Sequence, residues 1–554
     1  MACQSSPMRK LLLLLLSLSC VAQSPLPQSV YDEFAGTNSV INMPQGTYTL
    51  PGSAPLLLKR SGVTVNFSGC NLLVNPADKA NDGFYPIQVA SATITTNTYP
   101  GGPGTRTKSH LIGSISECTT QLTMDPAEVV SLTPGERVLI WAGAAPSDPV
   151  EPAAFIPATV SSVDSRGVIT FAAPLGKLVP NYGSLAGMSN ATTPSLQWKI
   201  GAWGSWPSGA NFAKGFGVDH GLERFVGGMV HDVTFNDLTM SLQTVASSNA
   251  PNAMWDVSAL AVDGFTLRNF NITNPHGNTV HFWRSFNTLV DGATFSGHGQ
   301  NKIWNTQMSE AFALTAWGGD SLTYSNITVT GTDIAAFATE VGAGGITVND
   351  LVFDVEFTSA RTYASSPTIL GFHTPATKPR ITNASLYAVT TGGTAHGYYT
   401  YDPIDFYGDL IFPGSSLTAW FDFGSQKFPT LNGSVTLNSI AYGPAVALAT
   451  NVTLLHGAGS RTFKPPEGIY TTGRFRVTTL GSVRAVDDTQ GGTYSWSDVQ
   501  SGAWLPVMPN RWHQIGAGDT ALASYLAKGI KFWFNSPSVN DAVVEFEFTY
   551  LPRQ

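Results

Sequence analysis

Residues 276–340 hold a concentration of side chains that could transfer protons, balance charge or contact a sugar ring. Histidine and carboxylate groups act as general acids and bases, while lysine and arginine neutralise anionic groups. The flat face of a tryptophan stacks on the apolar C–H surface of a pyranose ring. On these grounds the candidate catalytic residues are His281, Arg284, His298, Lys302, Glu310 and Glu340, and the candidate substrate-binding residues are His276, Trp283, Trp304 and Trp317.

Alternation along short apolar segments predicts which of these side chains share a face. If Val280 and Phe282 point into a core, the residues between and after them point away from it, because successive side chains of a strand lie on opposite faces. Parallel strands stack about 4.8 Å apart, so equivalent positions of successive strands would form one strip. The predicted strip contains His281, Trp283, Thr315, Trp317 and Glu340.

A repeated pattern predicts the elements that would position this strip. A short β-branched strand is followed by a single Asn, Asp or Gly and then by a second short apolar strand. Asn, Asp and Gly tolerate the left-handed backbone conformation that a sharp bend between two strands requires. We call these bend residues pivots; they recur every 23 to 34 residues, at Asp237, Asn269, Gly292, Asn326, Asp350, Asn383, Gly408 and Asn438.

This spacing predicts an all-β fold, a right-handed parallel β-helix in which each interval is one coil. A β-sandwich series or a propeller is the alternative, but a propeller would need a recurring signature of four strands per blade, which the sequence lacks. Together with the segments 41–50 and 61–65, the repeats resemble the pectate-lyase-like β-helix superfamily over roughly residues 28–118 and 190–460.

The resemblance implies a groove along the sheet that precedes each pair of pivot strands, where the predicted strip would lie. It does not select one activity, because this fold hosts lyases, hydrolases, epimerases and adhesins. Gly297-His298-Gly299 resembles the Gly-His-Gly motif of polygalacturonases. The acidic motifs of that family are absent, although its chemistry needs a carboxylate on each side of the scissile bond. The motifs of pectate lyases are absent as well.

Two reaction classes therefore remain open. β-Elimination needs a base and a cation that neutralises the uronate carboxylate, and His281, His298, Lys302 and Arg284 could supply both without a metal. Hydrolysis needs two acids, for which Glu310, Asp320, Glu340, Asp256 and Asp263 are available. We expect a secreted enzyme that cleaves or remodels a polysaccharide, either a lyase or a glycoside hydrolase. The alternative is a non-catalytic polysaccharide-binding or cell-surface adhesion protein.

The first 22 residues have the pattern of a signal peptide. Arg9 and Lys10 precede a leucine-rich run, and small residues lead to a cleavage site after Ala22. Lipid attachment at Cys20 is the alternative. No later run approaches the roughly 20 apolar residues of a membrane span. These features predict a secreted, extracellular or periplasmic protein without a membrane span.

The rest of the chain is predicted to form four parts: an N-terminal cap with the first coils at 23–120, an inserted small β-domain at 121–187, the main coil at 188–460, and a C-terminal antiparallel β-domain at 461–554. The insertion is expected from two alternating strands around Asp164–Gly167, a hairpin signal. The last part alternates with period two and has no pivots. It either covers the open end of the coil or is a carbohydrate-binding module.

Composition agrees with this class of fold. Charged residues make up only 12% of the chain, which contains 55 glycines, as expected for β-structure with many tight turns. The net charge is −8 and no basic run exists, which argues against nucleic acid as a partner. A polysaccharide is the expected partner, and the sequence leaves the oligomeric state open.

The cysteines and glycosylation sequons indicate which covalent modifications a secreted chain could carry. After cleavage only Cys70 and Cys118 remain, and they could form one disulfide in an oxidising compartment. Two thiols without a nearby histidine pair make a zinc site improbable. No cofactor is required by the sequence, and bound calcium is an open alternative. Seven Asn-x-Ser/Thr sequons would permit glycosylation.

Overall fold

The computed structural model describes residues 23–51, 54–75, 85–93, 119–123, 126–129, 131–142, 154–175, 220–226, 228–243, 255–275, 278–299, 312–343, 345–357, 368–372, 380–390, 396–400, 405–407, 410–412, 421–422, 430–437, 440–454, 460–463, 466, 468–477, 481–487, 505–507, 513–514, 530–535 and 542–554. The predicted signal peptide, 1–22, lies outside these ranges. Within them, no helix combines the length and the apolar composition needed to cross a bilayer.

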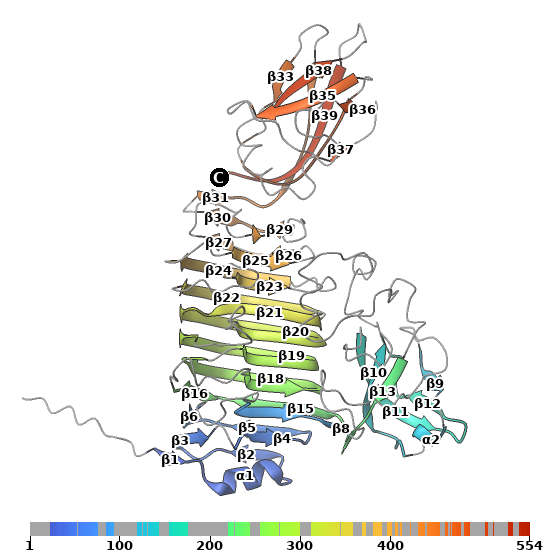
Figure 1. The fold of residues 1–554 in the computed structure, drawn as a ribbon, viewed down its shortest axis with the longest axis vertical. Coiled ribbons are helices and arrows are strands. Elements are labelled where there is room, and N and C mark those ends of the chain that lie inside the picture. Colours follow the sequence, from blue (N-terminus) through green and yellow to red (C-terminus); the bar gives the residue numbers. More distant parts are fainter. Residues whose placement is uncertain are drawn as a thin grey trace, which may run out of the picture.

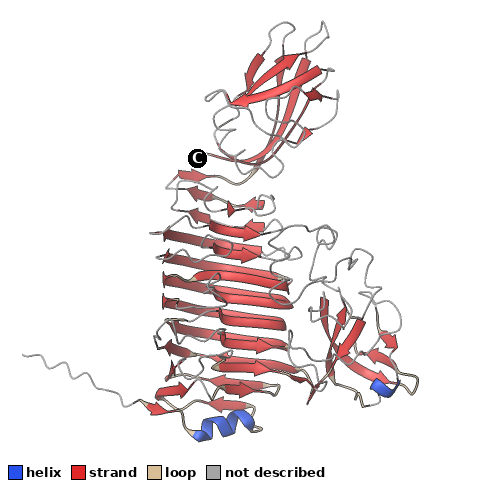
Figure 2. Cartoon of the chain, viewed as in Figure 1, coloured by secondary structure: helices blue, strands red, loops and turns tan. Residues whose placement is uncertain are grey.

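A parallel β-helix forms the body of the molecule, as predicted (Figure 1, Figure 2). The described residues contribute 24 strands to its coils, and β18, β19 and β20 each run around several corners of the coil. The strands are β1 (Ser24–Pro25), β2 (Val40–Asn42), β3 (Gly46–Pro51), β4 (Leu56–Leu58), β5 (Val63–Asn66), β6 (Cys70–Asn75), β7 (Ile87–Ala90), β15 (Val230–Asn236), β16 (Thr239–Leu242), β17 (Trp255–Leu260), β18 (Val262–Thr273), β19 (Asn278–His298), β20 (Phe312–Thr332), β21 (Ala335–Ala343), β22 (Ile346–Phe357), β23 (Thr368–Phe372), β24 (Arg380–Thr390), β25 (His396–Thr400), β26 (Asp405–Tyr407), β27 (Leu410–Phe412), β28 (Phe421–Asp422), β29 (Thr430–Asn432), β30 (Val435–Leu437) and β31 (Ile440–Tyr442).

The interior of the coil is filled by the inward-facing residues of successive strands. Phe265, Phe282, Tyr324 and Phe337 are at most 1% exposed and form a column of rings whose neighbouring centroids lie 5.0 to 5.9 Å apart. Burial raises the pKa of the Tyr324 hydroxyl well above its ordinary value. The N-terminal end is covered by α1 (Gln28–Ala35), whose buried side chains join the same core.

The pivots lie at one corner of the coil, as the sequence predicts. Asp237, Asn269, Gly292, Asn326 and Asp350 have φ angles of 58°, 53°, 73°, 55° and 54°. Strand pairing places them in one row, because the residues on either side are in register from β15 to β22. The next pivot, Asn383, is opposite Asp350 in β24. Gly408 and Asn438 lie outside the described residues.

A second row of positive φ angles was not predicted. It contains Asp232, Gly264, Asn287, Ser321 and Gly345, with φ between 50° and 81°. These residues come a few positions before each pivot, at the other end of the short strand segment that leads to it. Four of the five are Asp, Asn or Gly, as at the pivots, and only Ser321 differs in type. The sequence analysis missed this row because it followed only the single bend residue between two short strands.

The inserted β-domain is an antiparallel sheet in the order β13-β10-β11-β12-β9, beside the coil (Figure 1). Its last strand, β13, lies beyond residue 187 but pairs with β10. A short antiparallel pair, β8 with β14, lies in the segments that join the insertion to the coil. The elements are β8 (Ala92–Thr93), β9 (Gln121–Thr123), α2 (Pro126–Val129), β10 (Arg137–Ala142), β11 (Ala154–Val163), β12 (Val168–Phe171), β13 (His220–Glu223) and β14 (Phe225–Val226).

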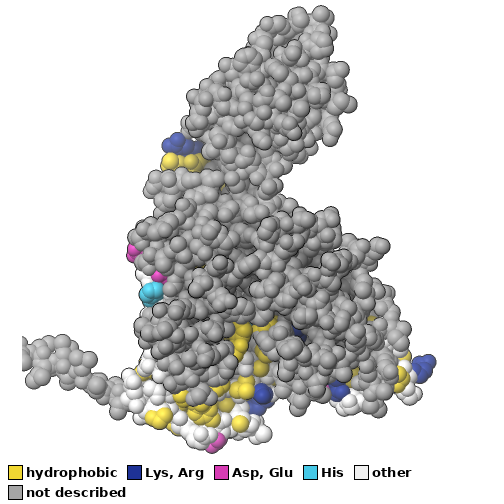
Figure 3. Space-filling model, viewed as in Figure 1, with side chains coloured by type: hydrophobic (Ala, Val, Ile, Leu, Met, Phe, Trp, Pro, Cys, Tyr) yellow, Lys and Arg dark blue, Asp and Glu magenta, His cyan; other side chains and the backbone are white. Residues whose placement is uncertain are grey.

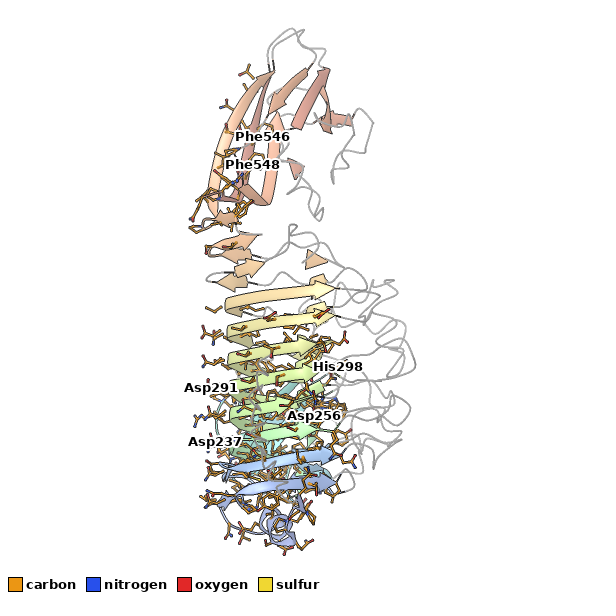
Figure 4. All side chains as sticks on the ribbon, turned by 90° about the vertical axis from the view of Figure 1, so that its left-hand side faces the viewer. Asp237, Asp256, Asp291, His298, Phe546 and Phe548 are labelled. Carbon is orange, nitrogen blue, oxygen red and sulfur yellow. The ribbon has the colours of Figure 1, made fainter. Side chains whose placement is uncertain are left out.

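The C-terminal β-domain consists of two four-stranded antiparallel sheets, β32-β39-β34-β37 and β33-β38-β35-β36. It begins at β32, earlier than the predicted residue 461. Buried Phe546 and Phe548 stack with centroids 5.7 Å apart (Figure 4). The strands are β32 (Val446–Leu454), β33 (Ser460–Phe463), β34 (Gly468–Val477), β35 (Gly481–Asp487), β36 (Leu505–Val507), β37 (His513–Gln514), β38 (Ile530–Asn535) and β39 (Ala542–Pro552).

The end of the chain returns to the last coil. β30 and β31 pair antiparallel, which ends the parallel stack. Leu551 is fully buried in the core of the coil, and the backbone N–H of Gln554 donates to the carbonyl of Ala441 at 3.0 Å. The last residues therefore cover the open end of the coil, one of the two roles expected for this domain.

Candidate functional site

The predicted strip is aligned as the sequence analysis expects. Across β17, β19, β20 and β21, Ser258, His281, Thr315 and Ala338 form one row of strand partners. Leu260, Trp283, Trp317 and Glu340 form the row beside it. Val280 and Phe282 belong to the core of the coil, whereas Trp283 packs with Trp255 in a separate cluster, as the predicted alternation requires.

The described part of this strip is closed to solvent. His281 is 1% exposed and Trp283 is 2% exposed. The imidazole of His281 stacks on Trp255 with a centroid distance of 4.5 Å and an angle of 9°, and Trp283 packs edge-on against both rings. Trp255, which the sequence analysis did not select, packs in turn against Tyr85, with ring centroids 4.7 Å apart and planes tilted by 44°. We call Trp255, His281 and Trp283 the aromatic cluster.

Burial also decides the chemistry of His281. Its Nδ1 lies 2.7 Å from Oγ1 of Thr315, and that hydroxyl donates to the carbonyl of Val280 at 3.3 Å. The hydroxyl therefore accepts a hydrogen bond from Nδ1–H. Burial lowers the pKa of His281 to about 3, because a charged imidazole loses its hydration there. His281 is neutral and a weak base at neutral pH, and proton transfer by it would require the aromatic cluster to open.

Arg284 follows the aromatic cluster at a bend of β19. It has a φ of 49°, a conformation that costs a non-glycine residue about 1–2 kcal/mol. Its side chain is 6% exposed, and fully buried Asp256 lies on the neighbouring strand β17 (Figure 4). Arg284 was predicted to be the cation that neutralises a substrate carboxylate, and this role remains a prediction. Little of the Arg284 surface is accessible to a substrate.

Among the predicted catalytic residues whose side chains the structure describes, His298 is the accessible one: its side chain is 45% exposed. Its Nδ1 lies 3.0 Å from the carbonyl of Gly299 and therefore carries the proton, because a carbonyl only accepts. Its Nε2 lies 3.8 Å from Oδ2 of Asp333, whose side chain is 2% exposed. The backbone N–H of His298 is 3.3 Å from the side-chain oxygen of Asn274. Figure 4 shows His298 on the opposite edge of the coil from Asp237 and Asp291.

A polar face lies between the pivot corner and His298. On the strand segments that follow the pivots, the outward residues pair in two rows. The residues between them, such as Phe295 and Val329, are fully buried, so the alternation fixes the outward direction. We call the outward set the hydroxyl face; its members are Asn271, Thr273, Thr294, Ser296, Thr328 and Thr330.

The hydroxyl face continues toward charged residues. In β22 the corresponding positions are Val352 and Asp354, and His298 is in register with Thr332 and then with Glu356. Asp354 and Glu356 are exposed. The sequence analysis missed this face because it followed the strands before each pivot; the Thr-x-Thr and Asn-x-Thr spacing after the pivots was the available signal.

The structure does not describe the side chains of several predicted site residues. His276, Lys302, Trp304 and Glu310 lie outside the described residues, and the side chains of Trp317 and Glu340 are not described although their backbones are. Within the described ranges there is no group of three or more His, Cys, Asp or Glu side chains that could hold a metal ion. The described surface around α1 and the first coils is mostly uncharged (Figure 3).

Cys70 is a free thiol within the core of the coil, 1% exposed, and burial raises its pKa to about 11. Cys118 lies outside the described residues, so the expected disulfide is not shown.

No protein-family model and no curated protein matches the chain. Among solved structures it is similar to the tailspike protein gp49 of Pseudomonas phage LKA1, with 11% identity, a TM-score of 0.31 and 94% of this chain and 91% of that chain covered. A capsular polysaccharide depolymerase, the tailspike gp49 of Acinetobacter baumannii bacteriophage Fri1, matches with 10% identity, a TM-score of 0.19 and coverage of 93% and 87%. A mutant tailspike of E. coli bacteriophage HK620 in complex with a pentasaccharide matches with 8% identity, a TM-score of 0.25 and coverage of 96% and 91%. With TM-scores this low, the neighbours carry no information about the function of this chain.

Proposed function

We propose that this chain is a secreted polysaccharide-modifying enzyme that binds its polymer along the hydroxyl face and transfers a proton through His298. The observation that carries the proposal is the position of His298, half-exposed, beside buried Asp333 and at the end of the strands that bear this face. The proposed secretion rests on the signal-peptide pattern of residues 1–22.

The His298–Asp333 pair has the features of a proton-transfer group. Since Nδ1 donates to the Gly299 carbonyl, Nε2 of the neutral ring carries the lone pair that can accept a proton. Once Nε2 is protonated, the imidazolium lies 3.8 Å from a carboxylate that is nearly excluded from water. The carboxylate thus faces the ring nitrogen that takes up the proton. The pair is thus a base oriented by its neighbours.

The hydroxyl face suits an extended, hydroxyl-rich polymer. Its hydroxyl and amide groups both donate and accept hydrogen bonds, so they match the hydroxyl groups of sugars. The rows repeat with the strand spacing of about 4.8 Å, and two outward residues of one strand are about 7 Å apart. A linear chain lying along the coil could therefore contact several successive strands and pass His298.

Elimination is the favoured reaction. The accessible group is an imidazole, which fits abstraction of a proton next to a uronate carboxylate. Hydrolysis is the second candidate, because exposed Asp354 and Glu356 place two carboxylates in the same rows as Ser296 and His298. The same face without turnover would make the chain a polysaccharide-binding protein.

A panel of purified polymers tests the proposal, with uronate-containing and neutral members. We expect release of fragments from a uronate polymer, with the ultraviolet absorbance of an unsaturated sugar. New reducing ends without that absorbance would indicate a hydrolase. Binding of polymers without fragments from any of them would contradict an enzymatic role and support a binding protein.

A further inference from the structure

A second polar site lies where the inserted β-domain meets the coil. A pocket of about 450 Å³ is lined by residues 131 and 133–137, at the start of β10, and by residues 224, 225, 228, 229 and 231, around β14 and the start of β15. Phe225 and Met229 line it and are 2% and 1% exposed, whereas Thr133 and Pro134 are exposed. The pocket thus has a buried apolar floor and an accessible polar rim, at a volume typical of small-molecule sites.

One wall of this pocket is fixed by a closed network. Arg224 forms a two-pronged pair with Glu136, with Nε–Oε1 at 2.8 Å and Nη2–Oε2 at 2.9 Å. Two further N–H groups, on Nη1 and Nη2, donate to the hydroxyl and carbonyl of Ser131 at 2.6 and 2.9 Å. Thr133 donates to Glu136 as well, through its backbone N–H at 3.1 Å. These donors and acceptors are satisfied, so this wall shapes the pocket but offers few hydrogen bonds to a ligand.

Arg137 supplies the other wall, and part of its guanidinium makes no hydrogen bond to the described residues. Its Nη1 donates to Oδ2 of Asp263 at 2.7 Å, and the second oxygen of Asp263 accepts from Asn287 at 2.7 Å. Within the described part of the chain, Nε and Nη2 of Arg137 have no hydrogen-bond partner, and its side chain is 31% exposed. Asp263 therefore holds one edge of the guanidinium and leaves donors on the rest of the group for a ligand.

His231 adds a second side chain with a ring nitrogen available for a hydrogen bond to a ligand. Its Nδ1 lies 2.7 Å from Oδ2 of Asp232 and donates to it. Among the described residues nothing contacts its Nε2 by a hydrogen bond, and its side chain is 36% exposed. The pocket thus presents the unsaturated Arg137 together with a ring nitrogen that can meet a hydroxyl group.

We propose that this pocket binds a carboxylate-bearing sugar of about one ring. Arginine recognises a planar carboxylate through two parallel N–H groups, and a charged acceptor strengthens these hydrogen bonds. The cavity is larger than a lone carboxylate, and the ring hydroxyls of a sugar acid reach His231 and the rim hydroxyl of Thr133. The pocket has no residue in common with the hydroxyl face or the His298–Asp333 pair, so this proposal does not depend on the proposed enzymatic function.

Binding of single sugars to the full chain tests this site, by isothermal titration calorimetry with glucuronate and galacturonate. The neutral parents glucose and galactose and inorganic sulfate serve as comparisons. We expect a uronate to bind at least tenfold more tightly than its neutral parent and than sulfate. Equal affinity for the neutral sugar, or tighter binding of sulfate, would overturn the carboxylate assignment.

Two matched variants separate ligand binding from a structural role of Arg137. Arg137→Lys keeps a cation for Asp263 but removes the planar fork, so we expect at least a tenfold loss of uronate affinity. Asp263→Asn removes the structural partner and leaves the fork, so affinity should stay within about threefold of the wild type while the melting temperature falls. An equal loss of affinity in both variants would show that Arg137 only fastens the inserted β-domain. His231→Ala, which leaves the Arg137–Asp263 pair intact, is expected to weaken binding severalfold, and unchanged affinity would count against the site.

Discussion

The side-chain amide of Asn269 donates a hydrogen bond to the carboxylate of Asp237, at 2.9 Å, across two successive coils. Both residues are pivots with positive φ. Asn326 makes a similar bond to Asp291, next to the pivot Gly292, at 2.7 Å. The pivot corner thus combines a backbone conformation that Asn and Asp tolerate with side chains that connect one coil to the next.

Substitution of Asn269 separates these two contributions. Asn269→Gly keeps the left-handed conformation and loses only an exposed hydrogen bond, so its melting temperature should fall slightly. Asn269→Ala loses the hydrogen bond and also forces alanine into the left-handed conformation. Its free energy of unfolding should therefore be about 1–2 kcal/mol lower than that of Asn269→Gly. Thermal unfolding followed by circular dichroism measures the difference, and equal melting temperatures for the two variants would contradict the assigned strain.

Close packing of neighbouring coils predicts a larger effect at Gly331. Its φ is +121°, and a Cβ there would lie 2.0 Å from the carbonyl oxygen of Gly297. Gly62, with φ +67° and no atom within 4 Å of its Cβ position, is the matched control. Gly62→Ala should cost about 1–2 kcal/mol through strain alone. Gly331→Ala should lower the free energy of unfolding by about 1–3 kcal/mol more than Gly62→Ala, because the added methyl group overpacks the contact, or it should prevent folding. Equal melting temperatures of the two variants would exclude the close approach.

The buried His281 predicts acid sensitivity. Its folded-state pKa of about 3 is below the ordinary 6.5, so the unfolded chain binds the proton more readily between these values. Stability contributed by the neutral ring is complete above pH 6.5 and declines as the pH falls toward 3, by on the order of 1 kcal/mol per pH unit. His281→Phe keeps a ring against Trp255 and cannot titrate. The melting temperature should therefore fall less between pH 7 and pH 5 in this variant than in the wild type, and parallel declines would contradict the assignment.

Cys70 is expected to be unreactive in the folded protein. Its thiol is buried and its pKa is raised to about 11, so little thiolate forms at neutral pH. Peptide mass spectrometry after iodoacetamide treatment should show Cys70 unmodified in the native chain and alkylated after unfolding without reductant. Resistance to alkylation in the unfolded chain until a reductant is added would instead reveal a disulfide.

The sequence predicts the coil well because the features that produce it are local in the chain. A residue that tolerates positive φ is needed at each pivot, and alternation fixes the direction of neighbours such as Val280 and Phe282. The second corner has the same residue types, with Ser321 as the exception, but the sequence analysis followed only the bend between the two strands of each pair. The extent of the inserted β-domain depends on the pairing of β13 with β10, which is far away in the sequence.

The site is less predictable because accessibility depends on contacts between distant segments. The register of His281 with Thr315 follows from the repeat, but its burial against Trp255 does not. The local motif of His298 pointed to chemistry without revealing Asp333, which the next coil brings to it. The Thr-x-Thr and Asn-x-Thr spacing after the pivots was a signal for the hydroxyl face, but the sequence analysis followed the strands before the pivots.

Turnover by a His298→Gln variant tests the central claim most directly, on whichever polymer the wild-type chain cleaves. Glutamine retains polar contacts but cannot accept the proton, so kcat should fall about 100-fold or more while KM changes little. Arg166→Gln, a change at an exposed hairpin turn of the inserted β-domain, is the control and should keep the wild-type rate. A wild-type kcat for folded His298→Gln would contradict proton transfer by His298.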